Sequence, residues 1–425
     1  MKTFYQFLYN AIVLPLLWLA LRTLGLVNGK IRRGIRGRRG LFASLQSQVA
    51  NKLGPGTRLW FHASSLGEFE QAKPIIAALK QRRNGIRIIV TFFSPSGFEH
   101  SKKYPLADVL SYIPFDTRAN ARRFLDLVRP DVAVIIRYDV WPNHLWELQR
   151  RGIPTLIANA TMRTNTRRRF PVVRHFHHFV YDAINDILTV SKDDAEAFSI
   201  FALSKPTIEA IGDTRYDQVS IRSAEAKRRH IVAEQILRGK RVLVAGSTWP
   251  EDEAVLIPTV VKLQETFGDL LLILVPHEPT LDYLEELESE IPGPSIRFSA
   301  LNEYSGERIV IVDSIGILLS LYSYAHVAYI GGSFKQNVHN VLEAAVYGVP
   351  VVYGPKHHNS QEAVKLAGSG GGFIVQDAQQ MYDVVKFLLE SEEKRTEAGR
   401  IAGDFVRRNV GATQRFLSHL DRYLK

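Results

Sequence analysis

A glutamate stands at the start of an expected helix, directly after a short apolar run. The segment FHASSLGE (61–68) passes from an expected strand over 58–63 into a helix over 68–83, and Gly67 allows a tight loop between them. Two interpretations of Glu68 follow. It is either a first-turn acid that stabilises the helix dipole, which is the simpler case, or a catalytic carboxylate, because active sites in doubly wound sheets lie in the loops that follow strands.

A second polar cluster lies in GGSFKQNVHNVLE (331–343), where a glycine-rich stretch ends an expected strand. A helix is expected to open at His339 and Asn340, with Glu343 on its first turn. Glycine-rich backbone beside a helix N-terminus binds anions, and an acid one turn into the helix can accept hydrogen bonds from a ribose diol. The cluster therefore indicates a nucleotide site, with an ordinary strand-to-helix connection as the alternative.

Several chemistries are disfavoured by what the sequence lacks. The chain has no cysteine, which excludes disulfides, thiolate metal sites and a cysteine nucleophile. It has no G-x-x-x-x-G-K-[ST] motif and no G-x-G-x-x-G after a strand, so P-loop ATPases and NAD enzymes are not expected. His175, His177 and His178 are spaced like metal ligands, but RRRFPVVRHFHHF (167–179) has no acidic partner. A basic, partly apolar face against membrane or phosphate fits this segment better.

Basic and apolar residues gather at the N-terminus. Residues 1–40 hold eight basic residues and no acidic one, so only +3 of the formal charge of +11 belongs to the other 385 residues, which argues against general nucleic-acid binding. Residues 4–27 are apolar over a bilayer-spanning length, with Arg22 as their only charge, and the basic block 28–39 follows. This order predicts a membrane anchor that keeps the following chain cytoplasmic. A cleaved signal peptide is the rival, and whether the anchor spans the bilayer or lies in its interface stays open.

From residue 57 onward, short β-branched runs alternate with amphipathic stretches, and a charged segment at 223–239 interrupts them. Such alternation predicts parallel strands covered by helices on both faces. The loops 246–253 and 276–279 are expected to end neighbouring strands on one rim. We predict an α/β fold with two doubly wound Rossmann-like domains. The predicted segments are a membrane anchor and basic arm (1–40), an N-terminal domain (41–220), a C-terminal domain (221–405) and a C-terminal helix packing back on the first domain (406–425).

Short motifs spread along the chain carry a resemblance to a known family. They are HASSLGE (62–68), TFFSPSG (91–97), IPFD (113–116), VWPN (140–143), IPTLIANA (153–160), GDTRYD (212–217), AGSTWPEDE (245–253), DSIG (313–316) and GGSF…HNVLEAAVYGVPVVYGP (331–355). In this order they cover almost all of residues 41–405. The sequence resembles bacterial 3-deoxy-D-manno-octulosonic acid (Kdo) transferases of lipopolysaccharide synthesis, which are membrane-anchored glycosyltransferases of the two-domain GT-B type.

The resemblance implies an inverting transfer of Kdo from CMP-Kdo, bound by the C-terminal domain, to a lipid A precursor (lipid IVA), bound by the N-terminal domain. Such a displacement needs one general base, and Glu68 matches the family's base. Asp139 and Arg215 match further catalytic positions, with Arg215 stabilising the departing CMP. The resemblance implies no cofactor and no metal. It also implies a location at the bacterial inner membrane with the catalytic domains on the cytoplasmic side, and no nucleic-acid partner.

The residues that match the family's donor-binding positions all lie in the second half of the chain. They are Gly246, Ser247, Pro276, His277, Ile315, Gly316, Ile317, Asn340, Val341, Leu342 and Glu343. The chain also departs from the family's pattern. Arg137 replaces the first acid of an E-x-E motif, Ile317 replaces a glutamate, Arg215 replaces a common lysine, and His277 replaces an arginine. These changes affect individual contacts more than the reaction, and an altered acceptor is a further interpretation.

Two alternatives stay open. A UDP-sugar-dependent GT-B glycosyltransferase of envelope synthesis has the same fold, although the motifs around Glu68 favour Kdo. The acids missing at Arg137 and Ile317 also fit a membrane-tethered binding protein that has lost catalysis. A run of arginines suggests that the acceptor face meets an anionic lipid. These arginines are Arg163, Arg167, Arg168, Arg169 and Arg174.

Overall fold

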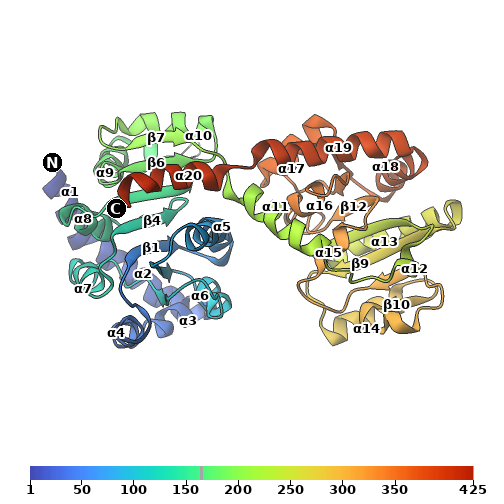
Figure 1. Cartoon of the computed structure of the whole chain (residues 1–425), viewed down its shortest axis with the longest axis horizontal. Coiled ribbons are helices and arrows are strands. Elements are labelled where there is room, and N and C mark those ends of the chain that lie inside the picture. The colour runs from blue at the N-terminus through green and yellow to red at the C-terminus, as the bar shows by residue number, and fades with distance from the viewer. Residues whose placement is uncertain (163–165, 425) are drawn as a thin grey trace. The chain divides into compact units, whose positions relative to one another are not determined.

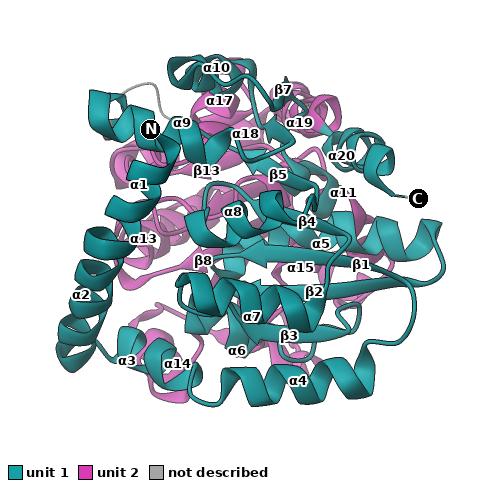
Figure 2. Ribbon diagram, turned by 90° about the vertical axis from the view of Figure 1, so that its left-hand side faces the viewer, with its two compact units in different colours: residues 1–218, 410–425 teal, residues 219–409 magenta. Residues whose placement is uncertain are grey.

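The protein forms two compact α/β units (Figure 1). The computed structural model describes residues 1–162 and 166–424. Unit 1 holds residues 1–218 together with 410–425, and unit 2 holds residues 219–409 (Figure 2). The boundary falls within helix α11 (Thr214–Lys227).

Unit 1 is built on a parallel sheet with the strand order β3-β2-β1-β4-β5-β6-β7. The strands are β1 (Thr57–Ala63), β2 (Ile86–Phe92), β3 (Val109–Tyr112), β4 (Val132–Ile136), β5 (Thr155–Ala160), β6 (Asp186–Thr189) and β7 (Thr207–Ala210). The helices are α1 (Lys2–Leu8), α2 (Leu14–Val27), α3 (Gly29–Gly37), α4 (Leu41–Lys52), α5 (Leu66–Arg82), α6 (Pro95–Ser101), α7 (Arg118–Val128), α8 (Pro142–Arg150), α9 (Pro171–Tyr181), α10 (Lys192–Ala197) and α20 (Ala412–Leu420).

Strand β1 shows why this sheet is covered on both faces. Leu59, Phe61 and Ala63 pack into a core on one face, and Trp60 packs into the core on the other face. All four side chains are buried, and each large one stabilises the fold by about 1.5–3 kcal/mol relative to exposure. Strand β1 pairs with β2 on one side and with β4 on the other. The strand order therefore reverses between β1 and β4, and a crevice opens at the carboxyl ends of strands at such a switch point.

Unit 2 repeats the doubly wound design with the strand order β10-β11-β9-β8-β12-β13-β14. The strands are β8 (Arg241–Thr248), β9 (Leu270–Pro276), β10 (Ser295–Arg297), β11 (Ile309–Ile311), β12 (Val327–Ile330), β13 (Val351–Tyr353) and β14 (Gly372–Ile374). The helices are α12 (Glu234–Leu237), α13 (Pro250–Thr266), α14 (Leu281–Glu290), α15 (Leu318–Tyr322), α16 (Leu342–Ala345), α17 (Gln361–Ser369), α18 (Ala378–Glu390) and α19 (Glu392–Asn409). The switch point lies between β8 and β12. The two doubly wound sheets predicted from the sequence are confirmed.

The C-terminal stretch differs from the single helix that the sequence suggests. Helix α19 ends at Asn409, and α20 begins at Ala412 after Gly411, whose φ of 107° is open to glycine but strained for other residues. Asp217 fixes this break, because its carboxylate accepts hydrogen bonds from the backbone N–H groups of Gly411 (2.7 Å) and Thr413 (2.9 Å). The contact joins residues almost two hundred positions apart, which local sequence patterns do not reveal.

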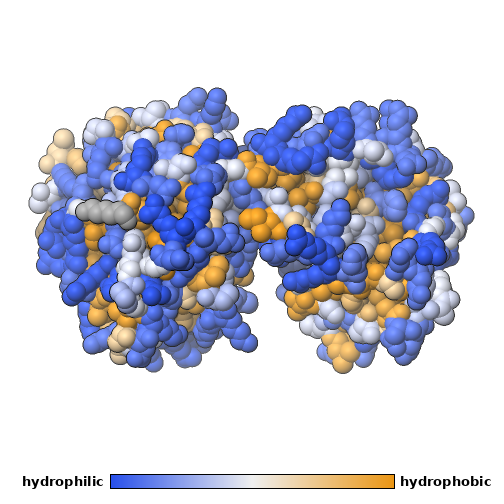
Figure 3. All heavy atoms as spheres, viewed as in Figure 1, coloured by the Kyte–Doolittle hydropathy of each residue, from blue (hydrophilic) through white to orange (hydrophobic). Residues whose placement is uncertain are grey.

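The N-terminus forms one long apolar helical run. It comprises α1, a π-helical turn (Tyr9–Val13) and α2, and residues Lys2–Val27 are long and apolar enough to cross a membrane. Asn28 then starts α3 by accepting hydrogen bonds from the N–H groups of Lys30 (3.0 Å) and Ile31 (3.2 Å). Over the face shown in Figure 3, hydrophilic residues predominate and hydrophobic residues lie in small groups among them. The apolar side chains exposed on the N-terminal helices include Phe4, Phe7, Ile12, Leu16, Trp18, Leu19, Leu24, Leu26 and Val27.

Candidate active site

Glu68 lies in the first turn of α5, just beyond the carboxyl end of β1. Its Oε2 accepts a hydrogen bond from the backbone N–H of Ser64 at 2.5 Å, and the residue is only 7% exposed. Burial raises the pKa of Glu68, and the negative charge of Asp139 adds to this. The Ser64 hydrogen bond and the charges of His62 and Arg137 partly offset the increase. A buried carboxylate with a raised pKa is a stronger base than an exposed one.

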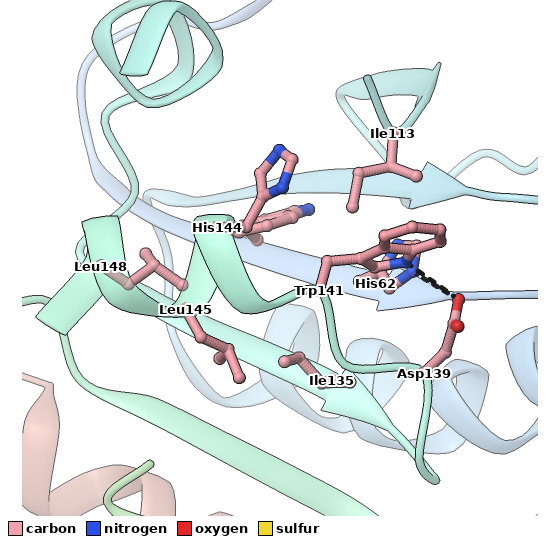
Figure 4. A pocket seen from close by; sticks show the side chains of 9 residues that line it. His62, Ile113, Ile135, Asp139, Trp141, His144, Leu145 and Leu148 are labelled. Carbon is pink, nitrogen blue, oxygen red and sulfur yellow. Dashed lines mark hydrogen bonds and ion pairs between the residues drawn. The ribbon is translucent and has the colours of Figure 1, made fainter. Parts of the chain in front are cut away.

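His62 and Asp139 form a pair across the switch point of unit 1. His62 is the next-to-last residue of β1, Asp139 follows β4, and His62 Nε2 lies 2.9 Å from Asp139 Oδ2 (Figure 4). The other ring nitrogen of His62 lies 2.9 Å from Oγ1 of Thr91, which fixes the ring plane. Trp141 Nε1 also donates to Asp139 Oδ2, at 3.3 Å. Burial raises the pKa of Asp139, but the hydrogen bond and charge of His62 outweigh it, so the pKa lies below its usual value.

Sequence reasoning singled out Asp139 but not His62 or Thr91. The histidine is the first residue of the motif HASSLGE. Its position near the carboxyl end of the strand that precedes Glu68 is the signal that could have identified it. Thr91 belongs to the neighbouring strand β2, where it pairs with His62 in register. Only the strand order shows that these residues meet.

Arg137 has the backbone geometry of a residue held under strain. It follows β4 with a φ of 65°, in the left-handed region that non-glycine residues seldom adopt. Its N–H donates to the carbonyl of Ala158 at 2.8 Å, so the neighbouring strand helps to hold it there. Its Nε is buried and has no hydrogen-bond partner among the described residues. The charge of this arginine, which stands where the resemblance implies an acid, lowers the pKa of Glu68.

Arg215 lies on α11 in the same unit, and a short bond network ties it to the helix of Glu68. The guanidinium of Arg215 donates to buried Asp213 at 2.7 and 2.8 Å. Next to it, Thr214 Oγ1 donates to the carbonyl of Gln71 at 2.7 Å, one turn after Glu68 on α5. Asn159 Nδ2 donates to the same threonine hydroxyl at 2.6 Å. The three residues predicted to be catalytic therefore all belong to unit 1, and the Thr214–Gln71 hydrogen bond joins the start of α11 to the helix of Glu68.

A small cavity lies beside the His62–Asp139 pair, with room for about one water molecule. Trp141 and His144 line it (Figure 4). His144 Nδ1 lies 2.5 Å from Asp116 Oδ1, and Nε2 of His144 has no partner among the residues that the structure describes. Asp116 is fully buried and also accepts a hydrogen bond from Tyr9 of the N-terminal helical run at 2.8 Å. The N-terminal helix is thus tied to the wall of the site.

In unit 2, three aromatic rings lie next to one another in the segments that follow β8, β9 and β12. The ring centroids of Trp249 and His277 lie 4.7 Å apart, and those of His277 and His339 lie 4.5 Å apart. Trp249 Nε1 donates to His339 Nε2 at 3.1 Å, and the ammonium of Lys335 lies 3.7 Å from the Trp249 ring centroid. Burial lowers the pKa of His339, with the charge of His277 adding to the effect. A neutral His339 ring is consistent with its acceptor role.

In the glycine-rich loop after β12, backbone N–H groups donate hydrogen bonds to a carboxylate of the protein itself. Asp252 is fully buried and accepts hydrogen bonds from the N–H groups of Gly332 (2.7 Å) and Phe334 (3.2 Å). The prediction of a free anion site in this loop is therefore wrong for these two N–H groups. The helix that follows also begins later than predicted, at Leu342, and has a single turn. The sequence could not show this, because the anion that fills the loop lies on α13.

The predicted donor-binding residues follow several strands of unit 2 at one edge of its sheet. Gly246 and Ser247 are in β8, Pro276 ends β9, and His277 follows it directly. Residues 315–317 lie in the loop after β11, Asn340 and Val341 lie in the loop after β12, and Leu342 and Glu343 begin α16. A Cβ on Gly246 would lie 2.1 Å from the Tyr322 hydroxyl, so the strand requires glycine there. Gly316 has a φ of 88°, and its neighbour Ile315 is 87% exposed. Asn340 accepts a hydrogen bond from the N–H of Leu342 at 3.2 Å.

The predicted cationic face lies around α9. His175 and His177 bind backbone carbonyls of their own helix at 2.9 and 2.8 Å, and His178 binds that of Phe201 at 2.8 Å. Across residues 1–162 and 166–424, no group of three or more His, Asp or Glu side chains is placed to hold a metal. Arg169 and Arg174 are exposed, whereas Arg163 lies outside the described residues.

Comparisons with known proteins relate this chain to one family of transferases. A family model described as 3-deoxy-D-manno-octulosonic-acid transferase (kdotransferase) matches residues 33–218. The 3-deoxy-D-manno-octulosonic acid transferase of Haemophilus influenzae is 25% identical over 433 residues, which cover 99% of this chain and 99% of the relative. That of Chlamydophila psittaci is 26% identical over 382 residues, covering 87% of this chain and 86% of the relative.

The fold has counterparts among solved structures. A UDP-GlcNAc 2-epimerase from Neisseria meningitidis, bound to UDP-GlcNAc, aligns with a TM-score of 0.60 over 86% of this chain and 100% of its own. At 14% identity this likeness concerns the GT-B-like fold alone. The sequence relatives, in contrast, align over nearly the whole chain and share one activity. The chain belongs to the 3-deoxy-D-manno-octulosonic acid transferases, a family of glycosyltransferases.

Proposed function

We propose that this Kdo transferase takes the sugar from CMP-Kdo and adds it, with inversion, to a hydroxyl of the lipid A precursor lipid IVA. The observation that carries the proposal is the buried carboxylate of Glu68, held by the Ser64 N–H at the switch point of unit 1. In the reaction, the acceptor oxygen bonds to the anomeric carbon while the bond from that carbon to the CMP phosphate oxygen breaks. The electron pair leaves with CMP, and the acceptor proton passes to Glu68.

The His62–Asp139 pair supports this role for Glu68. Asp139 keeps a negative charge near the base, which raises the pKa of Glu68 and strengthens its affinity for the acceptor proton. The His62 hydrogen bond at 2.9 Å keeps Asp139 ionised and in place. In this account Glu68 takes the proton, and Asp139 positions and tunes it without contacting the reacting atoms.

Arg215 is proposed to stabilise the negative charge that develops on departing CMP. Its guanidinium is oriented by Asp213 at 2.7 and 2.8 Å, which leaves the planar fork in a defined direction. The hydrogen bond from Thr214 to Gln71 fixes the start of α11 on the helix of Glu68, so both groups belong to one rigid frame. An arginine keeps the positive charge of the family's lysine and presents its N–H donors in a planar arrangement that suits phosphate oxygens.

The predicted donor set of unit 2 is proposed to hold CMP-Kdo. Its members lie at the carboxyl ends of β8, β9, β11 and β12, which is where doubly wound sheets bind nucleotides. The N–H groups of Gly332 and Phe334 already donate to Asp252, so other groups must bind the phosphate of CMP. Cationic side chains are the natural substitute.

We further propose that the protein works on the cytoplasmic side of the bacterial inner membrane. One helical run, Lys2–Val27, is apolar enough to cross a bilayer. The basic block that follows it favours the cytoplasmic side and anionic headgroups. The exposed Phe170 and Val172 at the start of α9, close to exposed Arg174, are a second surface suited to the membrane interface.

Transfer assays with a panel of donors test the donor and the acceptor. Full-length protein in detergent is incubated with lipid IVA and CMP-Kdo, UDP-GlcNAc or UDP-glucose, and products are identified by mass. The proposal expects one or more Kdo residues on lipid IVA with CMP-Kdo alone. It also expects NMR to show that the anomeric configuration of the product is opposite to that of the donor, which is the mark of inversion. Turnover of a UDP-sugar would contradict the donor, and binding of CMP-Kdo without turnover would favour the inactive binding protein.

A further inference from the structure

An amphiphilic groove lies in unit 1 between the N-terminal helices and the body of the domain. Helix α3 folds back against α2 and packs on α6 (Figure 2). The groove between them has a volume of about 260 Å³. Its apolar walls include Trp18 and Leu21 of α2, Ile31 and Ile35 of α3, and Phe93 and Pro95. We call it the α2–α3 groove.

The charges around the α2–α3 groove all have one sign. Arg22, Lys30 and Arg38 line it, and no acid does so in the part of the chain that the structure describes. Arg38 is held in place by the carbonyls of Gly34 (2.9 Å), Ile113 (3.0 Å) and Phe93 (2.8 Å). Arg22 and Lys30 are exposed. An apolar channel rimmed by cations suits a molecule with an apolar chain and an anionic head.

The groove shares its wall with the candidate active site. Ser94 lines the groove, and its N–H donates to the carbonyl of Ser64 at 2.8 Å. Ser64 in turn donates to Glu68 at 2.5 Å. On the same wall, the ring centroid of Phe93 lies 5.0 Å from that of Trp141, which binds Asp139. Ser94 and Ser64 therefore link the groove to the proposed base through two successive hydrogen bonds.

The groove is also continuous with the surface expected to meet lipid. Trp18 lies in both, because it lines the groove and is 47% exposed on the candidate membrane helix. Leu16 and Leu19, its neighbours on α2, are exposed as well. A lipid can pass from the bilayer along α2 into the groove without leaving an apolar surface.

We propose that the α2–α3 groove holds an acyl chain of the phosphorylated acceptor lipid, with Arg22 and Lys30 at its phosphate. This inference rests on the proposed function, and it adds how the acceptor is placed. The acyl chain anchors the lipid in the groove while its sugar hydroxyl reaches Glu68 across the Ser64–Ser94 wall. The enzyme thereby selects an acylated acceptor over a bare sugar.

A matched pair of substitutions on α3 tests the groove. Gly34 lines it, and a Cβ there would lie at ordinary contact distance, 3.4 Å from Pro95, so Gly34→Leu projects into the groove without a clash at its base. Gly29 is on the same helix with nothing within 4 Å, so Gly29→Leu makes the same change in open space. Both changes replace a glycine of α3 by the same apolar side chain.

Direct binding of lipid IVA to the full-length protein in detergent is measured by native mass spectrometry, with fully deacylated lipid IVA as the second probe. We expect Gly34→Leu to weaken lipid IVA binding at least about tenfold and Gly29→Leu to leave it unchanged. Neither variant should alter the weak binding of the deacylated probe. Equal binding of lipid IVA by Gly34→Leu and wild type would overturn the proposal.

Two charge-reversal variants test the groove independently, in case Gly34→Leu disturbs folding. Lys30→Glu reverses a charge at the groove, whereas Arg36→Glu makes the same change in net charge at an exposed position of α3 outside it. Only Lys30→Glu should weaken lipid IVA binding, by about fivefold or more.

Flotation with phosphatidylglycerol vesicles separates the acceptor from ordinary lipid. If Gly34→Leu and Lys30→Glu lower flotation and leave lipid IVA binding intact, the groove is a phospholipid contact and the proposal is wrong. Because binding is measured without turnover, a wild type that binds lipid IVA in the groove but transfers no sugar would overturn the proposed function alone.

Discussion

His62 Nε2 and Asp139 Oδ2 lie 2.9 Å apart, at the carboxyl ends of the two neighbouring strands where the sheet of unit 1 reverses its order. Within this pair, the charge of Asp139 raises the pKa of buried Glu68, and that of His62 lowers it. Because the pair acts on the pKa of Glu68 through its charges, a change in the pair should shift the pH dependence of the reaction. The first two predictions follow from this arrangement.

The acidic limb of kcat/KM should lie above the pKa of an ordinary glutamate, about 4.3. Glu68 acts in its ionised form, and burial raises its pKa, so activity is lost as the pH falls through this raised value. A pH profile of the wild-type enzyme measures the limb directly. An acidic limb at or below the ordinary value would mean that Glu68 is not the titrating base.

Replacing Asp139 with asparagine should move the acidic limb to lower pH, because the Asp139 charge raises the pKa of Glu68. Asp126→Asn is the matched control, since Asp126 is exposed and pairs with Arg151 at 2.8 Å. It should leave the limb in place. If both variants shift the limb equally, the effect is one of net charge and the specific role of Asp139 is wrong.

Glu68→Gln should stabilise the fold at neutral and higher pH. The folded state raises the pKa of Glu68, so its ionisation costs stability, and that cost appears as the pH rises through the folded pKa. Below the unfolded pKa the glutamate is protonated in both states, and the difference between wild type and variant should shrink. Thermal unfolding at several pH values measures the difference. A wild type that is more stable than Glu68→Gln at high pH would show that the Ser64 hydrogen bond outweighs burial.

Asp252→Asn should destabilise unit 2 by roughly 2–4 kcal/mol. Each carboxylate oxygen accepts two hydrogen bonds, Oδ1 from Tyr329 and Phe334 and Oδ2 from Trp249 and Gly332, so an amide NH₂ meets two donors in either orientation. Chemical denaturation of the full chain measures the loss in the free energy of unfolding.

Asp269→Asn serves as the control for Asp252→Asn. Asp269 makes a half-exposed ion pair with Arg241 at 2.9 Å in the same unit, and such pairs contribute only about 0–1 kcal/mol. A comparable loss for the two variants would contradict the structural role assigned to Asp252.

Local patterns revealed the fold and much of the site, but not the contacts between distant segments. Alternating apolar runs predicted both doubly wound sheets, and the loop after β1 singled out Glu68. The break at Gly411 depends on Asp217, and the glycine-rich loop is filled by Asp252, which lies eighty residues before Gly332. Each correction arises where a side chain from one segment satisfies backbone groups of another, and no local propensity encodes such a contact.

The central claim is that Glu68 takes the acceptor proton. The most direct measurement compares Kdo transfer from CMP-Kdo to lipid IVA by wild type, Glu68→Gln and Glu70→Gln. Glu70 is two residues away on α5, partly exposed and paired with Lys73, so its variant controls for the loss of one acid from the same helix. We predict that Glu68→Gln lowers kcat by a factor of about a hundred or more while Glu70→Gln stays near wild type. Wild-type transfer by Glu68→Gln would contradict the account and leave Glu68 as an acid that only caps its helix.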